Sequence, residues 1–113
     1  MYIINRSAII VRVKQPYVDW ANSLDDSEKY SLDSLNKENH IYLISDYDTD
    51  EELEEIIKDL YPEIFTVELS AWVTDPKLWP KNRDYTTFKE WFEIEAHSMV
   101  FDPYEDTIEA EEV

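Results

Sequence analysis

The sequence contains no glycine, and this absence excludes several kinds of functional loop. Phosphate-cradling loops and dinucleotide-binding turns need glycine, because it adopts positive φ and lets the backbone approach a ligand closely. The strained turn that presents the serine nucleophile of α/β-hydrolases needs glycine as well. These three kinds of site are therefore excluded in their usual forms, and no cofactor is expected.

Cysteine is also absent, which excludes disulfides and thiolate metal sites and is typical of the reducing cell interior. The two histidines, His40 and His97, stand in neither of the common helical metal-binding spacings, H-x-x-x-H and E-x-x-H. The run Asp46–Asp50 opens like a calcium loop but is not followed by the required glycine. No metal site is predicted, although Glu95 and His97 remain two possible ligands.

Basic residues are scarce, with 10 Lys and Arg against 27 Asp and Glu, and the net charge is −17. Such a surface repels nucleic acid and anionic lipid, so neither direct nucleic-acid binding nor membrane binding is expected. It favours basic partners or serves solubility alone. No run approaches the ~20 apolar residues of a membrane span, and residues 8–11 are too few for a signal peptide. We expect a cytoplasmic protein.

The sequence nevertheless has ample material for a core, since 43% of its residues are apolar and 14% are aromatic. A chain of 113 residues is typical of one domain. We expect residues 1–101 to form this domain. Residues 102–113 carry six acids and no base, and we expect them to form an acidic C-terminal tail.

Hydrophobic periodicity predicts an α+β fold with the order β-α-β-α-α-α-β. The expected elements are a strand over 2–14, a helix over 16–24, a strand over 40–45, a helix over 50–61, a helix opened by Pro62, a helix capped by Asp84 and a strand over 94–101. We expect a mixed sheet of about three strands with helices mainly on one face. The first two strands are expected to be parallel, because a strand–helix–strand unit favours a right-handed crossover.

One candidate site lies on the last strand, where Glu95 and His97 share a face. If the first and last strands are neighbours, these residues lie beside Arg12 on the face away from the helices. His97 could then act as a general base near neutral pH in a small enzyme. The alternative is a structural ion pair on a half-covered sheet.

The same sheet face is expected to be partly apolar and to lack a covering helix. The apolar residues assigned to it are Ala8, Ile10, Tyr42, Ile44, Met99 and Phe101. A second copy or another protein commonly buries such a face. The leading hypothesis is therefore a non-catalytic protein-binding or regulatory module that forms a homodimer. An alternative is an acidic decoy that inhibits a basic, nucleic-acid-binding protein, because residues 46–68 hold ten acids and one base.

A second candidate is the proline-fixed segment that follows Trp72 and contains Asp75, Trp79 and Arg83. An irregular loop with tryptophan can build one wall of a pocket or a protein contact. Alternatively, Trp79 closes the end of the core, and Asp75 caps a turn or pairs with Arg83.

Several quoted segments together resemble a group of small acidic uncharacterised bacterial proteins. They are Val11-Arg12-Val13-Lys14-Gln15-Pro16-Tyr17 followed by Trp20, Thr74-Asp75-Pro76 with Trp79-Pro80, and Trp91-Phe92 with Glu95 and His97-Ser98. The resemblance spans most of the chain. It implies a bacterial, cytoplasmic protein and transfers no catalytic role to any residue.

Overall fold

The central strand of the fold is β2 (Ser7–Val13), which pairs with β3 (His40–Ile44) on one side and β4 (Phe92–His97) on the other. A computed structural model describes residues 1–25 and 29–113 of the chain. The β-branched run of β2 is buried, as expected for a strand at the centre of a sheet. The α+β class and the three-stranded sheet predicted from the sequence are confirmed.

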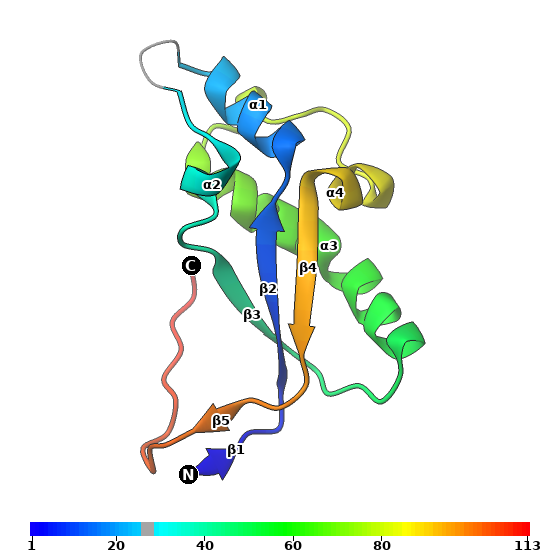
Figure 1. Ribbon diagram of the computed structural model, residues 1–113, viewed down its shortest axis with the longest axis vertical. Helices are drawn as coiled ribbons and strands as arrows, with labels where there is room; N and C mark the ends of the chain where they lie inside the picture. Colours follow the sequence, from blue (N-terminus) through cyan, green and yellow to red (C-terminus); the bar gives the residue numbers. More distant parts are fainter. Residues whose placement is uncertain (26–28) are drawn as a thin grey trace.

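The strand directions differ from the prediction, because both pairs in this sheet are antiparallel. The expected mixed sheet with a parallel first pair is therefore wrong. Helix α1 (Gln15–Ser23) and the short helix α2 (Leu32–Leu35) lie at the end of β2 rather than across the sheet (Figure 1). The chain therefore re-enters the sheet from the end at which it left, which makes β3 antiparallel to β2.

Helix α3 (Asp50–Trp72) is one continuous helix of 23 residues, with Pro62 inside it. The separate helix predicted to open at Pro62 is therefore wrong. Proline removes one backbone donor but fixes φ at a helical value. The buried residues Ile57, Ile64 and Phe65 stand on both sides of the proline. Burial of the same helix face on both sides of Pro62 therefore keeps α3 continuous despite the missing hydrogen bond.

Polar side chains cap α2 and α4, and the cap at Asp84 confirms the sequence prediction. Ser31 and Ser34 form a reciprocal capping box at α2. Asp84 accepts a hydrogen bond from the Thr87 backbone at the start of α4 (Tyr85–Trp91). A short 3₁₀ helix, η1 (Pro76–Leu78), lies between α3 and α4.

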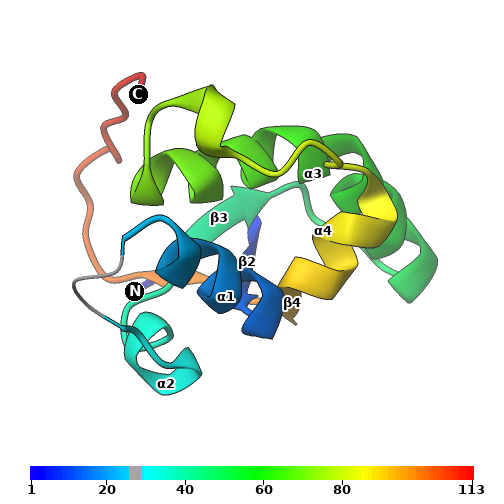
Figure 2. The same ribbon diagram turned by 90° about the horizontal axis from the view of Figure 1, so that it is seen from above.

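The core lies between one face of the sheet and helices α3, α1 and α4. Figures 1 and 2 show α3 crossing behind the sheet, with α1 and α4 at its upper end. The largest fully buried side chains include Ile9 and Val11 from β2, Phe65 and Leu69 from α3, and Phe88 from α4. None of the described helices runs across the opposite face (Figure 2).

The chain ends meet in a separate two-stranded antiparallel ribbon formed by β1 (Tyr2–Ile3) and β5 (Phe101–Asp102). The predicted last strand is therefore interrupted, since β4 ends at His97 and β5 begins at Phe101. Residues 103–113 contain neither helix nor strand and run beside the β3 edge (Figure 1). No helix in the described part of the chain combines the length and apolar character needed to cross a membrane.

Candidate functional site

The sheet face opposite the helices is the first candidate site, and we call it the open sheet face. Its members on β2 alternate along the strand with buried core residues. Its members on β3 and β4 lie opposite these β2 members in the register. They are Ala8, Ile10, Arg12, Ile41, Leu43, Glu93, Glu95 and His97. A charged half on β4 and an apolar half on β3 therefore flank the central strand.

The structure brings Arg12, Glu95 and His97 together in the charged half. Arg12 Nη2 lies 3.2 Å from Glu95 Oε1, and His97 Nε2 lies 2.8 Å from Glu95 Oε2. The hydrogen bond with His97, followed by the one from Arg12, lowers the pKa of the Glu95 carboxyl below its ordinary value. All three side chains are substantially solvated. This is the geometry of a surface ion-pair cluster.

The apolar half consists mainly of Ile41 and Leu43, which are 65% and 50% exposed. The sequence pattern predicted Tyr42 and Ile44 on this face, and that prediction is wrong. The register places Tyr42 opposite the buried Ile9, so Tyr42 and Ile44 face the core. The strand is apolar at both alternating sets of positions, and its sequence alone does not show which set faces inward.

The segment after α3 contains Asp75, Trp79 and Arg83, which the sequence grouped with Trp72. Trp79 donates a hydrogen bond from Nε1 to the Val73 carbonyl at 2.8 Å and packs against the core. The Arg83 guanidinium lies 5.7 Å from the Trp79 ring centroid, within cation–π range.

Asp75 accepts a hydrogen bond from the Lys77 backbone at 3.0 Å and so caps η1. No ion pair joins Asp75 to Arg83 in the described part of the chain. Trp72 lines a different hollow, beside Glu68. Asp75, Trp79 and Arg83 do not line that hollow.

A buried polar cluster surrounds Glu68, and it was not predicted from the sequence. Glu68 is only 5% exposed, and its Oε2 atom accepts a hydrogen bond from the Tyr42 hydroxyl. His40 Nδ1 lies 2.7 Å from the same oxygen and donates to it, because an ionised carboxylate only accepts. The Tyr17 hydroxyl donates to the Glu68 backbone carbonyl at 2.8 Å. One strand, β3, thus meets the side chain of Glu68, and helix α1 meets its backbone.

The environment of Glu68 acts on both tyrosines of this cluster. Burial is the main reason that the pKa values of Tyr42 and Tyr17 are raised above their ordinary value, and the negative charge of Glu68 raises both further. One sequence signal could have revealed the cluster. Glu68 lies among Ile64, Phe65 and Leu69 on the buried stripe of α3, where an acid requires a polar partner.

A hollow of about 170 Å³ opens beside this cluster. Its walls come from the end of β2, from α1, from the α2–β3 connection and from the last turns of α3. The lining residues are Val13, Tyr17, Leu35, Glu38, Asn39, His40, Glu68, Ala71 and Trp72.

Two larger hollows are more open. A groove of about 710 Å³ runs between α3, α4 and the β4 edge and has Leu53, Ile57 and Ile94 in its lining. Tyr85 lines it too, and burial together with a hydrogen bond to Glu54 raises the pKa of Tyr85 to about 12.

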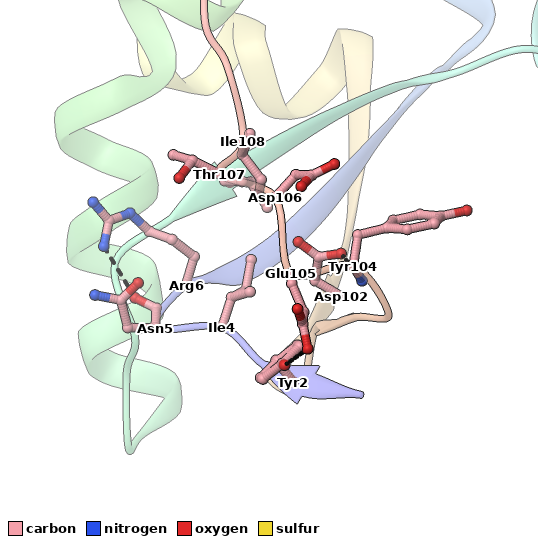
Figure 3. Close-up of a pocket in the computed structure, with 11 residues that line it drawn as sticks. Tyr2, Ile4, Asn5, Arg6, Asp102, Tyr104, Glu105, Asp106, Thr107 and Ile108 are labelled. Carbon is pink, nitrogen blue, oxygen red and sulfur yellow. Dashed lines mark hydrogen bonds between the residues drawn. The ribbon is translucent and has the colours of Figure 1, made fainter.

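The other hollow, of about 550 Å³, lies between the tail and the N-terminal segment (Figure 3). There the Tyr2 hydroxyl donates to Glu105 at 3.2 Å, and Leu43 and Ile108 contribute apolar lining. This hollow borders the open sheet face at Leu43. Neither His97 nor Arg12 lines any of the hollows described above.

No family model matches the chain, and searches of the curated proteins and of the solved structures return no match.

Proposed function

We propose that the protein is a non-catalytic protein-binding module that forms a homodimer through its open sheet face. The observation that carries this proposal is the exposure of Ile41 and Leu43 on a sheet face that none of the described helices covers. Contiguous exposed apolar side chains commonly mark a surface that another protein covers. A twofold contact would apply each such patch to the identical patch of the second copy.

The charge distribution supports this face over the acidic helix α3. Two copies that each carry −17 repel each other, so the contact should lie where uncompensated charge is lowest. The open sheet face holds two acids, Glu93 and Glu95, against the base Arg12. Helix α3 instead presents seven exposed acids against the one base Lys58. A second copy therefore meets less repulsion at the open sheet face than at α3.

The ion-pair cluster of Arg12, Glu95 and His97 contributes to this proposal as the polar border of the apolar patch. A general base needs a concave site that holds a substrate next to it. His97 lies on the solvated border of the face and outside the hollows described above. We therefore propose no catalytic role for the three residues.

The test is the molar mass in solution, measured by light scattering and sedimentation over a wide concentration range. Wild type should move from monomer toward dimer as concentration rises, and added salt should strengthen the dimer by screening the repulsion. Ile41→Glu and Leu43→Glu should remain monomeric. The matched control is Leu78→Glu, which alters an apolar side chain of 46% exposure on η1, outside the open sheet face, and should dimerise like wild type.

A strictly monomeric wild type at high concentration would refute the homodimer. Equal loss of dimer in the Leu78 control would show that added charge, rather than the open sheet face, governs association.

A further inference from the structure

We propose that the hollow beside Glu68 is a binding site for a primary ammonium group at the end of an alkyl chain. Such a group occurs on a lysine side chain of a partner and on a free alkylamine, and the chemistry of recognition is the same. This site lies on the helix-covered side of the sheet rather than on the open sheet face, so it does not depend on dimerisation.

The first support is an unused acceptor on a buried carboxylate. Both hydrogen bonds to the Glu68 side chain, from Tyr42 and His40, end on Oε2. Within the described residues, Oε1 receives no hydrogen bond, and no fully buried side-chain oxygen or nitrogen lacks a partner. Oε1 therefore opens to the hollow that Glu68 lines. A carboxylate oxygen in a poorly solvated site binds a donor strongly, and most strongly a cationic one.

The second support is the sign of the lining charges. Two carboxylates line the hollow, Glu68 at its base and the exposed Glu38, while no lysine or arginine contributes to the lining. The aromatic side chains of Tyr17 and Trp72 complete the walls. Aromatic rings attract cations through their electron-rich faces, so carboxylates and rings select the same kind of ligand. An anionic ligand finds no formal positive charge here apart from a protonated His40.

The third support is the volume of the hollow. Its 170 Å³ corresponds to roughly five or six water molecules at about 30 Å³ each. This space accepts the end of an alkylammonium chain but falls below the range of about 300–1,000 Å³ typical of sites for larger ligands.

The fourth support is that the carboxylate is fixed before any ligand arrives. Tyr42 and His40 hold Oε2 from β3, and Tyr17 holds the backbone carbonyl of the same residue from α1. A preorganised acceptor loses little conformational entropy on binding. The remaining oxygen, Oε1, is therefore presented in a defined direction toward the hollow.

The experiment titrates the full chain with n-butylammonium and, separately, with a short peptide that contains one lysine. Binding is followed by NMR chemical shifts and calorimetry at constant ionic strength. Butan-1-ol is the neutral control probe. Saturable binding of either amine, with shifts centred on Trp72 and His40 and no binding of butan-1-ol, supports the site. Binding of both amines indicates that a lysine side chain fits, whereas binding of n-butylammonium alone indicates a free amine as the ligand.

Glu68→Gln and Glu63→Gln form a matched pair of variants, because each removes one negative charge from α3. Glu68 lines the hollow, whereas Glu63 is exposed on the helix. Loss of a charge-assisted hydrogen bond should weaken amine binding at least about ten-fold in Glu68→Gln, and Glu63→Gln should bind within about two-fold of wild type.

Trp72→Leu provides a second test that leaves the buried carboxylate in place and therefore applies even if Glu68→Gln fails to fold. It should weaken binding several-fold through loss of the ring face. The absence of saturable amine binding to wild type would overturn the proposal. Equal weakening by Glu63→Gln and Glu68→Gln, or unchanged binding in Trp72→Leu, would also overturn it, since attraction by net charge alone would then explain the data.

Discussion

Replacement of Tyr42 by phenylalanine tests the buried cluster directly, because it removes only the hydroxyl that donates to Glu68. A hydrogen bond to a charged group contributes about 1.5–3 kcal/mol. The variant also leaves a buried carboxylate with one donor fewer. We therefore expect Tyr42→Phe to lower the free energy of unfolding at pH 7 by about 1.5–3 kcal/mol.

The size of this deficit should depend on pH. Burial, the hydrogen bond to Glu68 and the charge of Glu68 raise the pKa of Tyr42 above its ordinary value. In the unfolded chain, tyrosine ionises near pH 10. The stabilisation tied to a raised pKa is complete below the unfolded pKa and is lost as pH rises above it.

Above pH 10, the free energy of unfolding of wild type should therefore fall by up to about 1.4 kcal/mol per pH unit through this residue. Solvent screening at the partly exposed Tyr42 ring reduces this value. Tyr42→Phe has no such group. Its deficit should therefore shrink by up to about 2 kcal/mol between pH 10 and pH 11.5.

The assay is urea unfolding followed by the fluorescence of the four tryptophans at pH 7, 10 and 11.5. The control is Tyr104→Phe, which changes an exposed ring on the tail and should match wild type at pH 7. A deficit that stays constant up to pH 11.5 would refute the claim that the fold holds Tyr42 protonated. The absence of any deficit at pH 7 would refute the importance of its hydrogen bond.

Two further predictions concern the core and a helix cap. Phe65 is fully buried, and its ring centroid lies 5.3 Å from that of Phe92. Phe65→Ala should therefore lower the free energy of unfolding in urea by about 3–5 kcal/mol. The control Phe101→Ala, in the exposed ribbon, should change this free energy by at most about 0.5 kcal/mol. Asp84 caps α4, and its hydrogen bonds to Thr87 lower its pKa, so Asp84→Ala should lower the melting temperature at neutral pH. A lowered pKa gives stability that is present above the unfolded value and lost as pH falls through the folded value. The difference in melting temperature should therefore close in strong acid, and a difference that persists there would contradict this account.

Local physical chemistry made much of the fold predictable from the sequence. The cap at Asp84 follows from a side-chain oxygen that satisfies a free backbone donor three residues later. The adjacency of Arg12 to Glu95 and His97 follows from the alternation of side chains once the first and last strands are neighbours.

Other features depended on contacts between distant residues. The sequence could not fix which set of β3 side chains faces inward, because both sets are apolar and only the register with β2 distinguishes them. Pro62 predicts a helix boundary locally, yet packing on both sides of it keeps α3 continuous.

The Glu68 cluster shows the same division most clearly. Sequence position alone determined that an acid lies on the apolar stripe of α3. Only the tertiary structure decided that Tyr42 and His40 from β3 meet its side chain and that Tyr17 from α1 meets its backbone. Patterns along the chain report on neighbours within a helical turn or a strand pair, whereas a buried polar site depends on elements that meet only after the core has formed.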